Sequence, residues 1–147
     1  MIRRIAASER AAAAVEFALI APFFLAALFG LVEGGRMMWT RQALQQAAFS
    51  ASRCMALNAT GCTTVALTQT YAVTQARRAG VAIIASRVQA QASVTCSGQT
   101  NMRQVRISTP FISPARAFLP RQLRTITVAA CFPEPLQVDE SQSVTDS

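Results

Sequence analysis

From Ala12 to Val32 the chain reads AAAVEFALIAPFFLAALFGLV, a stretch in which Glu16 is the only charged residue. At a rise of about 1.5 Å per residue, a helix of this length spans the hydrocarbon core of a bilayer, which is roughly 30 Å thick. We therefore expect a transmembrane helix over residues 12–33.

Two residues are unusual for a simple anchor. A charged side chain at the centre of a membrane helix costs about 2.5 to 3.5 kcal/mol on insertion scales, and less near the interface, so Glu16 suggests a partner. The alternative is an acid that reaches the headgroups near the start of the helix. Pro22 removes a backbone donor, which kinks the helix or leaves the carbonyl of Ala18 free, although prolines also occur in ordinary membrane anchors.

The flanking charges predict the orientation. Arg3, Arg4 and Arg10 precede the apolar stretch and Glu9 alone opposes them, so the N-terminus is expected in the cytoplasm and the remainder outside it. Arg36 and Arg41 on the other side weaken this bias.

The composition argues against catalysis. All 14 basic residues are arginine, histidine is absent, and no Asp or Glu occurs between Gly34 and Pro133, which contain eleven of the arginines. Carboxylate pairs, Ser-His-Asp or Cys-His nucleophiles and the usual zinc sets with histidine are therefore excluded from this region. We expect no enzyme, no cofactor and no metal site.

The four cysteines all follow the apolar stretch. An even number in a small exported domain predicts disulfides, and the absence of a C-x-x-C spacing argues against zinc. Cys54 and Cys62 flank the turn-forming residues Asn58–Gly61, so we predict that these two cysteines form one bridge.

Residues Arg10 to Pro22, RAAAAVEFALIAP, resemble the start of the TadE-like pseudopilins, which are minor components of tight-adherence (Flp-type) pili. The resemblance implies a pilin-like fold and cleavage by a prepilin peptidase between Ala11 and Ala12, which makes residues 1–11 a cytoplasmic leader. Glu16 then becomes the fifth residue of the mature chain. The family usually has glycine before the cut, where this chain has Ala11.

The resemblance also implies partners and a location. These are the prepilin peptidase, other pilins and pseudopilins, the assembly platform of the bacterial inner membrane, and membrane lipid. The head would be periplasmic, or extracellular within a pilus. In a bundle of parallel helices, the amine of Ala12 would lie beside the Glu16 carboxylate of a neighbouring copy, since each charge is costly alone and tolerable as a pair.

Beyond the membrane segment, residues 34–61 are expected to form an amphipathic helical stem and a turn. Gly34 and Gly35 are expected to make the helix flexible at its start. The stem is expected to end near Leu57. Its apolar face is expected to lie on the globular domain or on another helix of a filament; it comprises Met37, Leu44, Ala48, Ala51 and Met55. Trp39, just outside the bilayer, is predicted to be an interface anchor.

Residues 62–133 are expected to form an exported α+β head. A second helix should begin after Thr63 or Thr64, end near Ala79 and stop at Gly80. Period-two alternation predicts a three-stranded antiparallel sheet with strands over Val88–Cys96, Arg103–Thr109 and Arg124–Phe132. Residues 134–147 are polar and acidic, and we expect a disordered tail.

The second bridge would be Cys96–Cys131, but the alternation conflicts with it. Cys96 lies on the apolar face of its strand and Cys131 on the polar face, and in a simple meander the middle strand separates them by more than a disulfide spans. A bulge at Ala129-Ala130, or direct pairing of the first and third strands, would remove the conflict.

Two classes of function remain. The first is a minor pseudopilin, a structural component assembled through its N-terminal helix. The alternative is a non-polymerising, single-pass anchored periplasmic binding module. The arginines are scattered without interleaved aromatic residues, which argues against nucleic-acid binding. An anionic lipid headgroup or a polysaccharide would account equally well for a basic surface on the exported part of the chain.

Overall fold

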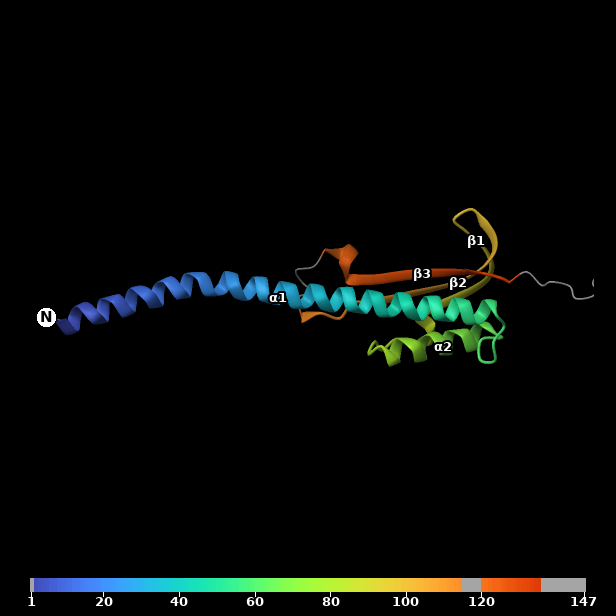
Figure 1. Cartoon of the computed structure of the whole chain (residues 1–147), viewed down its shortest axis with the longest axis horizontal. Coiled ribbons are helices and arrows are strands. Elements are labelled where there is room, and N and C mark those ends of the chain that lie inside the picture. The colour runs from blue at the N-terminus through green and yellow to red at the C-terminus, as the bar shows by residue number, and fades with distance from the viewer. Residues whose placement is uncertain (1, 115–119, 136–147) are drawn as a thin grey trace, which may run out of the picture. The chain divides into compact units, whose positions relative to one another are not determined.

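The computed structural model describes residues 2–114 and 120–135 of the chain. It contains the predicted long N-terminal helix, a second, shorter helix and a three-stranded antiparallel sheet, so the fold is α+β (Figure 1). Residues up to Met38 form one compact unit, and the residues from Trp39 onward form a second one, called here the head.

Helix α1 (Ile2–Ala56) is helical through Gly34 and Gly35 and ends one residue before the expected position. In the head, one face of α1 belongs to the core: Leu44, Ala48 and Ala51 are fully buried, as expected from the stripe of apolar residues. The chain leaves the helix at Asn58, whose φ of 46° lies in the left-handed region that Asn tolerates.

Helix α2 (Val65–Arg78) follows the turn. Thr64 is its N-cap, because the Thr64 hydroxyl oxygen accepts a hydrogen bond of 3.2 Å from the backbone N–H of Leu67. Gly80 has a φ of 80°, a conformation that glycine adopts without strain and that commonly follows the end of a helix.

The sheet has the strand order β1-β2-β3 and consists of β1 (Val88–Cys96), β2 (Gln99–Pro110) and β3 (Thr125–Pro133). Strand β2 begins earlier than predicted, because the hairpin turn is confined to Ser97 and Gly98, which have φ values of 50° and 84°. Such a two-residue turn with positive φ at both positions suits the twist of a hairpin.

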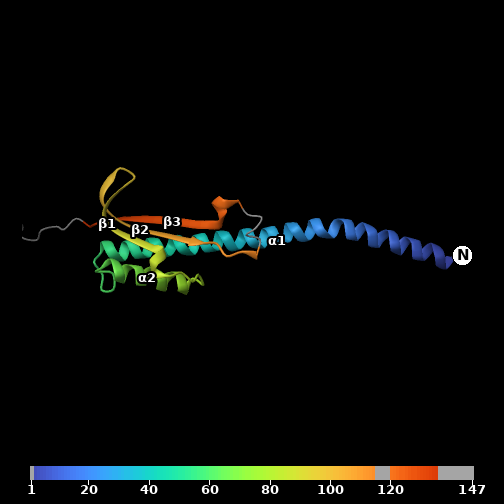
Figure 2. The ribbon, with the colours of Figure 1, turned by 180° about the vertical axis from the view of Figure 1, so that it is seen from behind.

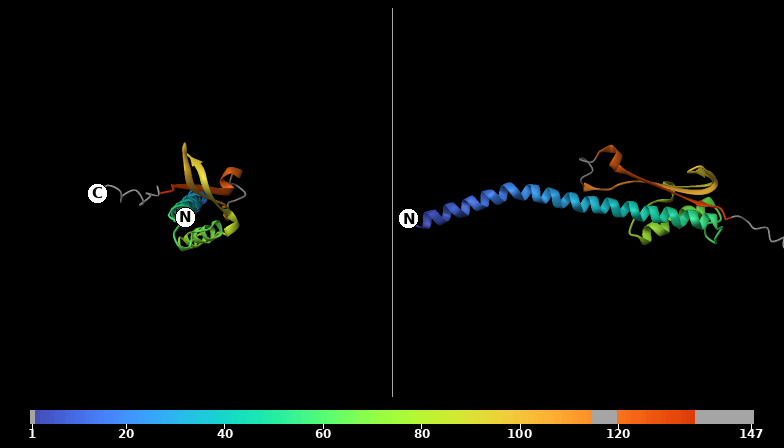
Figure 3. Two further views of the ribbon diagram at one scale, coloured as in Figure 1. Left: turned by 90° about the vertical axis from the view of Figure 1, so that its right-hand side faces the viewer. Right: turned by 45° about the horizontal axis from the view of Figure 1, so that its top comes forward.

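In the head, α2 and the part of α1 from Trp39 onward lie on the same side of the sheet (Figures 2 and 3). The buried sheet residues alternate with exposed ones, so one face forms the core with the helices; this face includes Val88, Val105, Ile107, Ile126 and Val128. Side-chain amides join the helices to backbone carbonyls of the two outer strands, from Gln45 to Ala129 at 3.1 Å and from Gln69 to Val88 at 2.8 Å.

The structure removes the conflict over Cys96 in a way that the sequence did not suggest. Strands β2 and β3 pair in regular register through Ala129 and Ala130, and β1 pairs with β2 alone, so both expected solutions are wrong. The register between β1 and β2 shifts twice instead: between Gln91 and Val94, where β1 holds one extra residue, and between Val94 and Cys96, where β2 holds one. The extra residue in β1 turns the end of this strand over, so that Cys96 lies on the face opposite the core.

The expected acidic tail begins at Glu134. Glu134, its first residue, forms an ion pair with Arg103 in β2, with Oε1 2.8 Å from Nη2. Residues 136–147, the rest of the expected tail, lie outside the described part of the chain.

Candidate functional site

The apolar part of α1 presents large hydrophobic side chains in all directions. Phe17, Phe23 and Leu31 are 73%, 78% and 75% exposed. In the described residues, this is the one helix whose length and composition would let it cross a membrane. A helix that is apolar all round requires a membrane or a partner to cover it, so this segment indicates membrane anchoring.

Glu16 lies one helical turn after Ala12, on the same face of α1. Its side chain is exposed and makes no ion pair with residues 11–114 or 120–135, whose side chains the structure describes. The carboxylate is therefore accessible to a group from outside the chain. The expected cleavage positions, Ala11 and Ala12, are also exposed on the helix surface.

Pro22 lies inside α1, which continues beyond it. Because proline has no N–H, the carbonyl of Ala18 loses its helical donor at this position. The blue section of α1 is bent in Figures 1 and 3.

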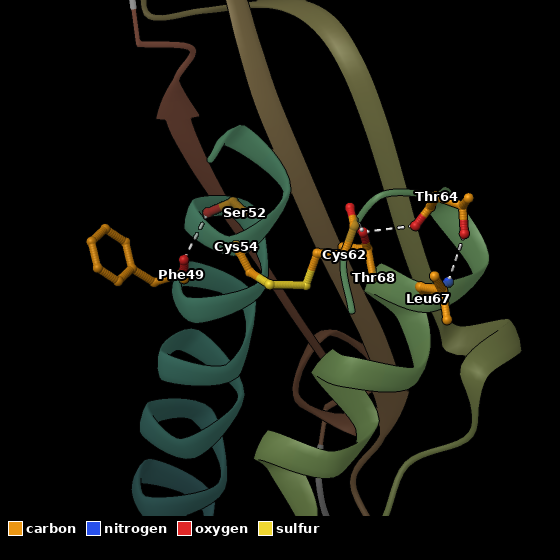
Figure 4. The surroundings of a disulfide bond; sticks show 7 residues. All are labelled: Phe49, Ser52, Cys54, Cys62, Thr64, Leu67 and Thr68. Atoms are coloured by element: carbon orange, nitrogen blue, oxygen red, sulfur yellow. Dashed lines mark hydrogen bonds between the residues drawn. A yellow bond between two sulfur atoms is a disulfide. The ribbon is translucent and has the colours of Figure 1, made fainter. Parts of the chain in front are cut away.

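The first disulfide, Cys54–Cys62, closes the turn between the two helices of the head, with Cα atoms 5.7 Å apart (Figure 4). Cys62 is almost fully buried. The buried hydroxyl of Thr68 donates to the backbone oxygens of Cys62 and Thr64, at 3.2 and 2.9 Å. The turn is thus fixed by a covalent bond and by hydrogen bonds from α2.

The second disulfide, Cys96–Cys131, lies on the sheet face away from the core. Within the described residues, no three His, Cys, Asp or Glu side chains gather where they could hold a metal ion. The chemistry available in the head is therefore that of arginine, amide and hydroxyl groups around two structural bridges.

Sequence reasoning missed two contacts. The Arg103–Glu134 pair joins residues 31 positions apart, and only the tertiary fold brings them together. Trp39, expected to anchor at the membrane interface, donates its indole N–H to the carbonyl of Ala79 at 3.4 Å, while the side chain remains 67% exposed. The position of Trp39 just after the apolar stretch predicted an exposed side chain. Nothing in the sequence predicted its hydrogen bond to the carbonyl of Ala79.

An apolar N-terminal helix followed by a small, disulfide-linked α+β head defines a class of membrane-anchored proteins. Residues 11–53 match the model of the family described as TadE-like protein, so this part of the chain is similar to that family, as its first residues indicated. No curated protein and no solved structure matches the chain.

Proposed function

We propose that this chain is a minor pseudopilin of a tight-adherence pilus or of a related secretion apparatus. The observation that carries the proposal is the match of residues 11–53 to the TadE-like family, over a helix whose apolar surface is uncovered. Lateral packing against other pilins would cover this surface in a filament, and lipid would cover it before assembly.

In this role Glu16 determines the axial position of the subunit. After cleavage between Ala11 and Ala12, the new amine of one copy neutralises the Glu16 carboxylate of its neighbour within the apolar bundle. A buried charge is tolerated only with a well-placed partner, so copies shifted along the axis would be disfavoured. The proposal is supported by the exposure of the Glu16 carboxylate and by its lack of an ion pair with residues 11–114 and 120–135.

The proposal places the N-terminus in the cytoplasm and the head in the periplasm. Two features support the arrangement: the arginines before the apolar stretch, and the two disulfides of the head, which persist in oxidising compartments. Prepilin peptidase acts on the cytoplasmic side, and the inner-membrane assembly platform receives the mature chain.

The test is the mass of the mature protein, purified from cells with a functional pilus apparatus. The chain is expected to begin at Ala12. Two substitutions at the position before the cut provide matched variants: Ala11→Gly should be cleaved at least as well, and Ala11→Leu should block cleavage, since the peptidase site accepts a small residue there.

Full-length, unprocessed monomers in cells that assemble pili would contradict the proposal. That result would favour the alternative, an anchored periplasmic binding module that does not polymerise.

A further inference from the structure

One end of the head gathers arginines and exposed apolar side chains. Helix α2 and strand β2 both end there, and a surface hollow is lined by Arg77 of α2, by Ile84 and Arg87 from the segment after α2, and by Thr109 and Pro110 of β2. The short helix η3 (Arg121–Arg124) reaches the same end, because the N–H of Phe111 donates to the carbonyl of Arg124 at 2.9 Å. We call this surface the basic end and define it by Arg77, Ile84, Arg87, Ile112 and Arg121.

The basic end is amphipathic. Ile84 and Ile112 are 62% and 80% exposed, and the three arginines are exposed as well. None of these arginines forms an ion pair with the residues that the structure describes. The sequence has no acidic residue between Gly34 and Pro133, so the positive potential is not cancelled by neighbours in this region.

The basic end is linked to a residue that closely follows the membrane segment in the sequence. Trp39 contacts it through the hydrogen bond to Ala79, the residue that follows α2. Trp39 is also only seven residues after Val32, the last apolar residue of the membrane segment.

We propose that the basic end docks on the anionic phospholipid headgroups of the membrane in which the chain is anchored. Arginines bind phosphate groups while exposed isoleucines enter the boundary between headgroups and acyl chains, a combination typical of interfacial binding surfaces. A polysaccharide would satisfy the arginines but would give the isoleucines no apolar environment. The inference depends on membrane anchoring by α1 and is independent of the role in a pilus.

The test uses the full chain in lipid nanodiscs and a single tryptophan as the probe. Trp39 is the only tryptophan, so Trp39→Phe/Ile84→Trp moves the fluorophore into the basic end. The matched control, Trp39→Phe/Leu57→Trp, places it at the turn that leads away from α1, where Leu57 is 49% exposed. Circular dichroism checks that both variants fold as the unmodified chain does.

In nanodiscs of phosphatidylcholine with added phosphatidylglycerol, we expect brominated lipid to quench the residue-84 tryptophan, whose emission moves to shorter wavelength. The tryptophan at residue 57 should be unaffected. In phosphatidylcholine alone, or at high salt, the quenching at residue 84 should fall, because the attraction is electrostatic. Equal quenching at residue 84 in both lipid compositions would overturn the proposal.

Charge removal gives a second, independent measurement. An arginine near an anionic surface changes the ratio of docked to free heads by roughly fivefold, so Arg77→Gln/Arg87→Gln should lower this ratio by roughly 30-fold. Arg53→Gln/Arg106→Gln removes two exposed arginines elsewhere and should leave it nearly unchanged.

Equal effects of the two arginine pairs would overturn the proposal. So would an emission shift at residue 84 caused by soluble polygalacturonate but not by phosphatidylglycerol, since that outcome identifies a polysaccharide site. Failure of these tests would leave cleavage at Ala11 and pilus assembly unaffected, so they are distinguishable from a failure of the pseudopilin proposal.

Discussion

Cys96 and Cys131 are joined by a disulfide, with Cα atoms 6.6 Å apart, although strand β2 lies between their strands. The bridge crosses β2 at Gln104, whose side-chain nitrogen lies 3.5 Å from the Cys96 sulfur and 3.4 Å from the Cys131 sulfur. Two features allow this: the two register shifts between β1 and β2, and the curl of the β1–β2 hairpin over the sheet (Figure 3). The bridge therefore holds the curled hairpin against the sheet.

The two disulfides should differ in their effect on stability. In the loop-closure model, a bridge across 35 residues contributes about 4 kcal/mol and one across 8 residues about 2.5 kcal/mol. Cys96→Ser/Cys131→Ser should thus lower the free energy of unfolding of the head more than Cys54→Ser/Cys62→Ser. Denaturant unfolding in detergent measures both; the reverse order would show that the long bridge is not formed in the native protein.

Ser93 is predicted to control the bulge. Its φ of 60° lies in the left-handed region, which is unfavourable for a β-branched side chain. Ser93→Val should destabilise the head by about 1 to 2 kcal/mol. Ser93→Gly, which removes the steric conflict, should be neutral or stabilising. If valine were tolerated as well as glycine, the bulge would not be located at Ser93.

Leu44 is the largest fully buried side chain in the head, and Leu44→Ala should cost about 2 to 5 kcal/mol of unfolding free energy because it leaves a cavity. Leu31→Ala makes the same chemical change at a side chain that is 75% exposed. It should leave the unfolding of the head unchanged. If both substitutions lowered the free energy of unfolding equally, the face of α1 that carries Leu44 would not be part of the core.

The start of α2 gives a prediction with a control one residue away. Thr64→Ala removes the hydroxyl that accepts from the N–H of Leu67 and should cost about 1 kcal/mol. Thr63→Ala should have little effect, since Thr63 is exposed and does not cap the helix. Thermal unfolding followed by circular dichroism distinguishes the two variants.

Glu16 is predicted to be required for assembly and dispensable for membrane insertion. Glu16→Ala should insert normally but fail to enter pili, as measured by fractionation of membranes and sheared filaments. The control is Glu33→Gln, which alters an acid already paired with Arg36 at 3.0 Å. Normal incorporation of Glu16→Ala would exclude the proposed pairing with a neighbouring amine.

The local elements followed from the sequence because their causes are local. The apolar stretch from residue 12, the cap at Thr64 and the alternation in Val88–Cys96 each act within a few residues. These signals were sufficient to predict the α+β composition, the limits of β1 and the TadE-like resemblance that the family match confirmed. They also indicated Glu16 as the unusual group of the membrane segment.

The tertiary structure alone decided what depends on residues far apart in the chain. Alternation in the sequence assumes an unbroken strand, so one inserted residue in β1 invalidated the predicted face of Cys96. The ion pair of Arg103 with Glu134 and the hydrogen bond of Trp39 to Ala79 also join residues that are far apart in the sequence, so no local pattern predicts them. The basic end is a further example, because its arginines belong to separate segments that meet only after β2 and α2 have packed.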